Sequence, residues 1–284
     1  MIKRILVALD PDEDTPLATK YAIQLARRFK ASLTGLAIVD MEDIYASVGT
    51  GGIGTIYYAE KLREFLTEEN RTEAQKLLAV FRDTVEESGI DHFVAVEEGV
   101  PYERIVEEMK YHDLLILGRD SHFFYTRPEK ETSTLPKVIK RSIAPTLIAT
   151  EQYRDVERVL VAFDESAASA RALQSFVHLL PYGKNVEIEL AHVVSEDSDE
   201  ARDEAKFLLR LAKKYLAAHH FESIRETVLT GGKPGEKLLE QMEKSEPDMV
   251  ILGAHSMSAI KRVTFGSTTY DLIRKSPAPL FVSS

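Results

Sequence analysis

The chain has 284 residues, of which 44% are hydrophobic and none is cysteine, and its formal net charge is −10 at pH 7. The missing cysteines exclude disulfides, thiolate catalysis and cysteine metal sites, and the excess of acidic residues excludes a general nucleic-acid-binding surface. No apolar run approaches a membrane span, and the first residues lead into a strand pattern instead of a signal peptide. We therefore expect a folded cytoplasmic protein that binds neither membranes nor nucleic acid.

Strand-like apolar runs alternate with helical patterns along the whole chain. In the first half, one helix begins at Thr15 with Pro16 in its first turn, a long helical pattern covers residues 57–88, and another helix begins at Pro101. This alternation predicts an α/β fold with a parallel sheet and helices on both faces. The expected strands are residues 2–9, 32–39, 93–96, 114–117 and 145–149, followed by residues 159–163, 186–194, 224–229, 249–252 and 280–282.

A glycine-rich segment between the second strand and the long helix satisfies the spacing G-x-G-x-x-G from Gly49 to Gly54. In a dinucleotide-binding domain this motif follows a strand directly, whereas residues 40–47 separate it from the strand here, and the second half has no counterpart. A loop or a dimer contact is therefore the favoured interpretation, and a pyrophosphate site is the alternative.

Four segments of the first half recur in the same order in the second half. A repeat of more than a hundred residues is a whole domain. We therefore predict two domains, residues 1–150 and 156–284, each with a five-stranded parallel sheet. The matching pairs are residues 5–10 and 159–164, 100–109 and 233–242, 113–118 and 248–253, and 138–145 and 272–279.

The end of the fourth strand of the second half has features of an anion site. Gly253 ends this strand, and after a loop Gly266, Ser267 and Thr268 precede a helical pattern that stops before Pro277. The free N–H groups of that helix would face the carboxyl edge of the sheet, where open α/β sheets bind ligands. The alternative is a glycine strand end and a hydroxyl helix cap with no ligand.

This segment resembles the nucleotide-binding signature of the universal stress protein family, which reads Gly, two residues, Gly, nine residues, Gly, then Ser or Thr. Gly253, Gly266 and Ser267 fall in register, and Ser256 replaces the second glycine. Its hydroxymethyl group would hold a phosphate farther out or donate a hydrogen bond to it. The resemblance covers both halves and implies two Rossmann-like domains of the adenine nucleotide alpha hydrolase-like type. It also implies ATP or AMP as the ligand, and ATP can bring Mg²⁺ with it.

The resemblance also implies roles for single residues. Asp164 matches the strand-end aspartate that holds the nucleoside, although an aspartate there can equally cap the following turn. Val193 matches the position whose backbone meets the adenine, and its neighbour His192 is expected to be a hydrogen-bonded core histidine. Lys261 and Arg262 could screen phosphate charge or lie at a solvated loop tip. The expected nucleotide-binding residues are Ala162, Phe163, Asp164, Val193, Gly253, His255, Ser256, Gly266, Ser267 and Thr268.

The first half departs from the signature. When Gly118 is aligned with Gly253, the counterpart of Gly266 is Glu131. A carboxylate at a helix N-terminus uses the donors that a phosphate would use and repels the ligand. We therefore expect the first domain, in which Asp10 corresponds to Asp164, to be a degenerate copy.

The combined prediction is a tandem universal stress protein with a regulatory role, in which one bound adenine nucleotide alters a surface read by an unknown protein partner. Family members pair through their last strands, which implies an internal pseudo-dimer or a homodimer. No base is evidently paired with a nucleophile, so we predict no catalytic residue and no metal site of the protein itself. The alternatives are a nucleotide-independent interaction scaffold and a slow ATPase or phosphoryl-transfer enzyme.

Overall fold

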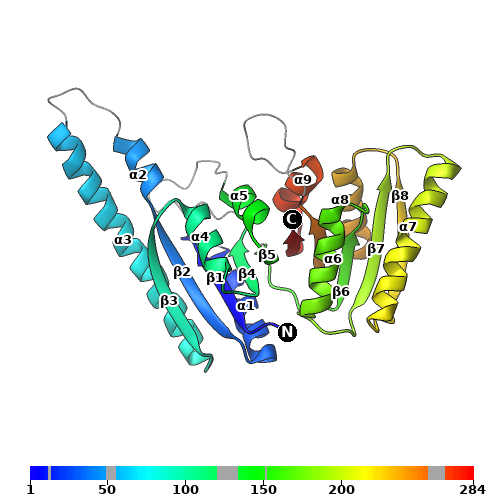
Figure 1. Ribbon diagram of the computed structural model, residues 1–284, viewed down its shortest axis with the longest axis horizontal. Coiled ribbons are helices and arrows are strands. Elements are labelled where there is room, and N and C mark those ends of the chain that lie inside the picture. The colour runs from blue at the N-terminus through cyan, green and yellow to red at the C-terminus, as the bar shows by residue number, and fades with distance from the viewer. Residues whose placement is uncertain (12–13, 49–55, 120–133, 151, 255–265) are drawn as a thin grey trace. The chain divides into compact units, whose positions relative to one another are not determined.

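The computed structural model describes residues 1–11, 14–48, 56–119, 134–150, 152–254 and 266–284 (Figure 1). These residues form two compact units, one of residues 3–138 and one of residues 139–284 together with Met1 and Ile2. Each unit is a sheet of parallel strands flanked by helices, so the predicted fold class is confirmed.

The first unit contains four parallel strands in the order β3-β2-β1-β4. Right-handed crossovers place α1 and α3 on one face of this sheet and α4 on the other. The strands are β1 (Arg4–Leu9), β2 (Ser32–Asp40), β3 (His92–Gly99) and β4 (Leu114–Gly118), and the helices are α1 (Thr15–Phe29), α2 (Met41–Val48), α3 (Ile56–Glu87), α4 (Pro101–Met109) and α5 (Thr134–Arg141), the last of which runs across the division between the units.

The second unit contains the strand order β5-β10-β9-β6-β7-β8. All neighbours are parallel except β5 and β10, which pair antiparallel with Phe281 opposite Leu147. Helices α6 and α7 cover one face, and α8 and α9 pack together on the other. The strands are β5 (Thr146–Ala149), β6 (Arg158–Ala162), β7 (Glu187–Val194), β8 (Ile224–Thr230), β9 (Met249–Gly253) and β10 (Leu280–Ser283), and the helices are α6 (Ala167–Leu179), α7 (Asp199–Ala218), α8 (Pro234–Ser245) and α9 (Ser267–Lys275).

Strand β5 is the last strand of the first repeat, yet it lies in the unit that contains the second repeat. The compact units therefore divide after Val138, before the expected boundary near residue 150. The physical reason is the ladder between β5 and β10, which ties residues 146–149 to the second repeat.

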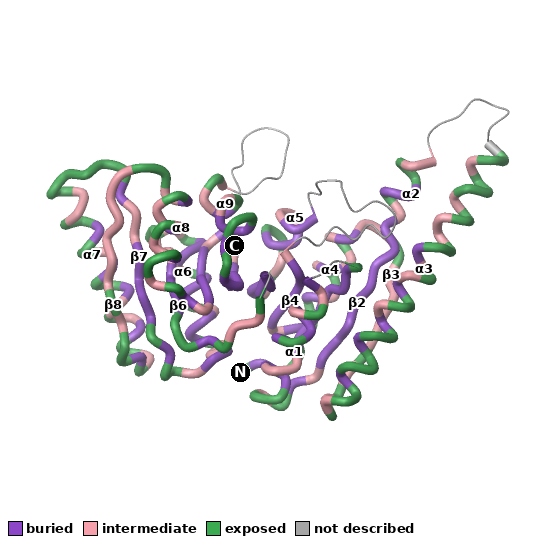
Figure 2. Tube along the Cα trace, turned by 180° about the vertical axis from the view of Figure 1, so that it is seen from behind, coloured by how far each residue is buried: buried purple, intermediate pink, exposed green. Residues whose placement is uncertain are grey.

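Burial follows the position of each strand in its sheet. The central strands β1, β4 and β9 are almost wholly buried, whereas the outermost strands β3 and β8 are half-exposed along most of their length (Figure 2). Strands covered on both faces read as continuous apolar runs, which is why the sequence pattern located them within one or two residues.

One local feature differs from the sequence expectation. Helix α2 follows β2 directly, where the sequence pattern indicated only a separating segment; the motif from Gly49 to Gly54 lies outside the described residues. Helix α1 begins at Thr15 as expected, with Asp14 at its N-cap position. The Thr15 hydroxyl donates to the backbone oxygen of Asp10 at 2.6 Å, closing the turn after β1. None of the described helices is long and apolar enough to cross a membrane.

Asp40, at the end of β2, is a buried carboxyl group whose pKa is raised. Its side chain is buried, and its Oδ1 accepts a hydrogen bond from the Asp43 backbone N–H at 3.1 Å. Burial, with a smaller contribution from the Asp43 charge, raises the pKa of Asp40 from 3.8 to about 6. A raised carboxyl pKa means that the folded state binds the proton more tightly than the unfolded state does. The protonated residue therefore favours folding near pH 4, and this contribution is lost as pH rises through about 6.

We predict that Asp40→Asn, which keeps the acceptor but carries no charge, increases the free energy of unfolding by about 1 to 2 kcal/mol more at pH 7.5 than at pH 4. Urea unfolding at the two pH values measures this difference, and Asp83→Asn on the exposed surface of α3 is the control. An Asp40→Asn effect that is the same at both pH values would contradict the prediction.

Candidate functional site

The carboxyl ends of β6, β7 and β9 meet the start of α9 at one edge of the second sheet. Register places Ala162 beside Leu252 on one side and Ala191 on the other. Together these elements bound a cavity of about 250 Å³. It brings together eight of the ten residues expected to bind nucleotide, namely Ala162, Phe163, Asp164, Val193, Gly253, Gly266, Ser267 and Thr268. The other two, His255 and Ser256, lie outside the described residues, as do Lys261 and Arg262.

Gly253 is required by the packing of α6. A Cβ atom at this position would lie 2.2 Å from the Ser169 backbone nitrogen and 2.4 Å from the Ala168 carbonyl carbon. Both are backbone atoms of the first turn of α6, so neither can move aside as a flexible side chain would. Close packing of α6 against the end of β9 is therefore a reason for a glycine at this position.

The start of α9 forms the polar side of the cavity. Gly266 is the N-cap residue, with φ −59° and ψ 153°, and its carbonyl accepts from the Tyr270 N–H at 3.0 Å. The Thr269 hydroxyl donates to the Gly253 carbonyl oxygen at 3.3 Å, which ties the helix start to the end of β9. The N–H groups of a first helical turn have no partner within the helix. The helix thus directs the positive end of its dipole toward the cavity.

Asp164 lies two residues beyond the end of β6 and is exposed. Its Oδ1 accepts from the Ser166 N–H at 3.1 Å, and Ser166 caps α6 by accepting from the Ser169 N–H at 3.1 Å. Between them, Glu165 has a left-handed backbone with φ 60°, which is uncommon for a residue with a side chain. The turn-capping role considered for Asp164 is therefore present, and the same tight turn sets its carboxylate at the rim of the cavity.

His192 holds the floor of the cavity in place. The Phe163 N–H donates to the Ala191 carbonyl at 2.9 Å, which continues the β6–β7 ladder one residue past β6. The His192 ring nitrogen Nδ1 lies 2.7 Å from the Phe163 carbonyl oxygen, so Nδ1 carries the proton and donates. This matches the expectation of a hydrogen-bonded histidine and gives it a positioning role beside Phe163.

Sequence reasoning missed part of the lining. The missed residues are mostly small or apolar and come from five elements: Ser169, Ala191, Pro234, Leu238, Leu252 and Thr269. Pro234 stands at the start of α8, in one of the segments that recur between the halves. The order of strands in a doubly wound sheet would have brought this helix start to the same edge.

The corresponding edge of the first unit is built differently. Asp10 is buried and lines a separate cavity of about 340 Å³ between α1 and α3. The Asp14 carboxylate accepts from the Arg119 backbone N–H at 3.2 Å, just beyond the end of β4. In the repeat alignment Asp14 corresponds to Ala168, so a buried carboxylate lies here where the second unit has a methyl group. Glu131, the acid expected to replace Gly266, lies outside the described residues.

The described residues contain no preformed metal site, because no three histidine or acidic side chains among them lie close enough together to bind one metal ion. Chemically, the described lining of this cavity offers an apolar floor, one carboxylate, the first turn of a helix and four hydroxyls, those of Ser169, Ser267, Thr268 and Thr269. This combination suits an uncharged ring and an anionic group on the same ligand.

Comparison with known proteins identifies the family. The sequence pattern of the universal stress protein family matches residues 1–149 and again residues 155–284. The chain belongs to the universal stress protein family. It is similar to a universal stress protein of Synechocystis sp., with 24% identity over 290 residues that cover 98% of this chain and 99% of the relative. A universal stress protein of Methanocaldococcus jannaschii is 27% identical over 157 residues, covering 55% of this chain and 86% of the relative.

Among solved structures, a universal stress protein from Archaeoglobus fulgidus aligns with a TM-score of 0.69 at 21% identity, covering 99% of this chain and 98% of that chain. This likeness shows the fold of two universal stress protein domains in tandem. Another universal stress protein, solved in complex with cAMP, aligns with 45% of this chain and 97% of its own at 21% identity and a TM-score of 0.37.

The contact between Gly253 and α6 leads to a stability prediction. Gly253→Ala should lower the free energy of unfolding by about 3 kcal/mol or more, because the new methyl group meets backbone atoms. Gly89→Ala is the control: it has open space around it and a φ of 67°, so it should cost only about 1 kcal/mol of backbone strain. Urea unfolding measures both, and equal losses for the two variants would show that α6 can move away from β9.

Proposed function

We propose that the second domain, residues 156–284, binds one adenine nucleotide, ATP or AMP, in the cavity at the carboxyl edge of its sheet. One observation carries the proposal. The signature residues of the family line a cavity whose floor is apolar and whose other side is the N-terminus of α9. Members of this family bind adenine nucleotides, and one has been solved with cAMP.

The two sides of the cavity suit the two ends of a nucleotide. Ala162, Val193 and Leu252 offer an apolar surface for the base, and Asp164 at the rim is an acceptor for ribose hydroxyls. Ser267 and Thr268 contribute hydroxyls and first-turn N–H groups for phosphate. Together with the Asp164 carboxylate, these hydroxyls are oxygen ligands of the kind that Mg²⁺ accepts when it arrives with ATP.

The first domain, residues 1–150, is proposed to be a degenerate copy. Two observations support this assignment: Asp10 is buried beside α1, and the Asp14 carboxylate lies at the end of β4. A carboxylate at this edge repels an incoming phosphate and already uses a backbone donor that could have bound it.

The proposed role of the bound nucleotide is regulatory. Among the described lining residues, Asp164 is the one titratable side chain, and catalysis of phosphoryl transfer requires a group that positions the attacking water as well as groups that hold phosphate. We therefore propose a cytoplasmic protein that holds nucleotide and presents the altered surface to a protein partner. The pairing of β5 with β10 within one chain supports an internal pseudo-dimer.

Charge at the N-terminus of α9 is the first test. Gly266→Glu should abolish ATP and AMP binding, because the new carboxylate occupies the place proposed for phosphate. Gly266→Gln has nearly the same shape without the charge and should retain at least about tenfold more affinity. Calorimetric titration of the folded variants measures both, and wild-type affinity in Gly266→Glu would place the nucleotide elsewhere.

The assignment of the site to one domain is the second test. Asp164→Ala should weaken nucleotide binding about tenfold or more, the loss of a hydrogen bond to a charged group, whereas Asp10→Ala should leave it within about twofold. Asp164→Asn keeps an acceptor for the Ser166 N–H and separates loss of the turn from loss of the charge. Equal losses in Asp164→Ala and Asp10→Ala would show that both domains bind.

A further inference from the structure

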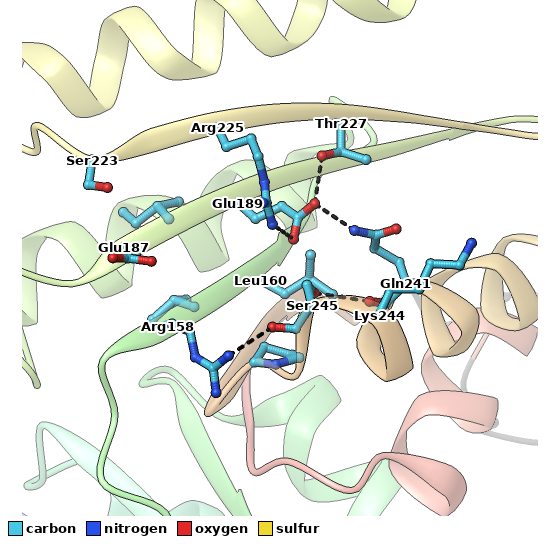
Figure 3. Close-up of a pocket in the computed structure, with 13 residues that line it drawn as sticks. Arg158, Leu160, Glu187, Glu189, Ser223, Arg225, Thr227, Gln241, Lys244 and Ser245 are labelled. Carbon is cyan, nitrogen blue, oxygen red and sulfur yellow. Dashed lines mark hydrogen bonds and ion pairs between the residues drawn. The ribbon is translucent and has the colours of Figure 1, made fainter.

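A second and larger cavity lies at the opposite edge of the same sheet, away from the signature residues. Its volume is about 760 Å³, and it is bounded by the amino ends of β6, β7 and β8 and by the last turns of α8 (Figure 3). The volume lies within the range of small-molecule sites, about 300 to 1,000 Å³. Among the residues that the structure describes, its lining shares none with the proposed nucleotide cavity.

A buried carboxylate organises this cavity. Glu189 is only 6% exposed, and three side chains from two other elements converge on it, as Figure 3 shows. Arg225 Nη2 lies 2.7 Å from Glu189 Oε2, and Glu189 Oε1 accepts from Thr227 Oγ1 at 2.6 Å and from Gln241 Nε2 at 2.7 Å. The ion pair with Glu189 positions the Arg225 guanidinium beside the cavity.

The positioned guanidinium keeps donors for a ligand. A guanidinium has five N–H groups, and one nitrogen of Arg225 faces Glu189 while two-thirds of the side chain remains exposed. Arg158 is also fixed at the cavity, because its Nη1 donates to the Ser245 carbonyl oxygen at 3.3 Å and its Nη2 lies 3.5 Å from Asp248. Lys244 adds an exposed ammonium group on α8.

Most of the cations at the cavity already have a carboxylate partner. Among the described residues the lining has three cations, Arg158, Arg225 and Lys244, and two carboxylates, Glu187 and Glu189. Arg225 pairs with Glu189 and Arg158 with Asp248, so the cavity offers positioned donor groups and not a surplus of positive charge.

The carbonyl oxygens at the end of α8 would by themselves disfavour an anion. Two of them accept hydrogen bonds from the protein: the Gln241 carbonyl from the Ser245 hydroxyl at 3.0 Å, and the Ser245 carbonyl from Arg158.

The first repeat has a different arrangement at the equivalent place. The β1–β2 and β6–β7 registers make Thr34 the counterpart of Glu189, and the repeat alignment makes His112 the counterpart of Pro247. The His112 ring nitrogen Nε2 lies 2.9 Å from the Thr34 hydroxyl, and both side chains are buried. The charged lining is therefore a property of the second repeat and not of the shared fold.

We propose that this cavity binds a small hydroxylated organic anion, a carboxylate or a phosphate ester. Arg158, Arg225 and Lys244 bind its anionic oxygens through charge-assisted hydrogen bonds. Its hydroxyl groups donate to Glu187 and to the Thr227 oxygen, whose own proton is donated to Glu189, and exchange hydrogen bonds with the Ser223 hydroxyl. Because the described linings of the two cavities share no residue, anion binding at this edge does not require the nucleotide site.

The test titrates citrate and ribose 5-phosphate separately into the full chain by calorimetry. At least one of them should bind wild type and bind Gly266→Glu with the same affinity, since that substitution lies at the other edge of the sheet. Tighter binding of citrate assigns the site to carboxylates, and tighter binding of ribose 5-phosphate assigns it to phosphate esters.

Two variants then locate the binding. Lys244→Gln should weaken it about tenfold, and Lys244→Arg should restore most of the affinity. Ser223→Trp, at an exposed rim position, should block it by filling the entrance. Lys206→Gln on α7 removes an exposed lysine outside the cavity and should change nothing.

Three results would overturn the proposal. The first is that neither probe binds wild type at millimolar concentration. The second is that both probes lose binding in Gly266→Glu and keep it in Lys244→Gln, which would assign the anions to the nucleotide cavity. The third is that folded Lys244→Gln and Ser223→Trp both bind as tightly as wild type. Failure of nucleotide binding in Gly266→Glu has no bearing on any of these results, so the two proposals fail independently.

Discussion

The arrangement of the second unit depends on the direct contact between the end of β9 and the first turn of α6. At Gly253 there is room only for a hydrogen atom, because backbone atoms of Ala168 and Ser169 fill the space that a methyl group would need. This contact fixes where α6 starts and therefore where its cap, Ser166, lies. The turn that carries Asp164 is attached to that cap, so the position of its carboxylate follows from a packing constraint.

The two repeats share the same order of strands and helices but differ at the carboxyl edge of the sheet. Both place a strand, a turn and a helix in the same order, and both have a glycine at the end of the fourth strand. At the residue that packs near this glycine the second repeat has Ala168, whereas the first has Asp14, whose carboxylate accepts a backbone hydrogen bond from Arg119. A carboxylate thus replaces a methyl group, and in the first repeat a side chain of the protein itself takes up a backbone N–H at this edge of the sheet. The framework tolerates the change because sheet and helices are held by apolar packing elsewhere.

The sequence was sufficient to locate the strands and to name eight residues that line one cavity, because buried parallel strands read as apolar runs and the signature residues follow them at fixed distances. Helix α2 was missed because residues 41–48 form a short segment that continues directly from a strand, although Asp40 caps it by accepting from the Asp43 N–H. The cavity at the amino edge was not predictable in the same way. Glu189 reads as one of several polar residues in β7, and its partners Arg225 and Gln241 come from β8 and α8, 36 and 52 residues away. Only the folded register brings these three residues together.

The antiparallel ladder between β5 and β10 has a consequence for assembly. Two separate chains that pair through an edge strand must find each other in solution, and the paired fraction then falls on dilution. Here the two strands belong to one polypeptide, so the effective concentration of one strand at the other is set by the length of chain between them and stays constant at any protein concentration. The same ladder covers the outer edge of β10, where open backbone groups would otherwise be available to another molecule. Gene duplication can in this way replace an association governed by mass action with a permanent feature of the fold.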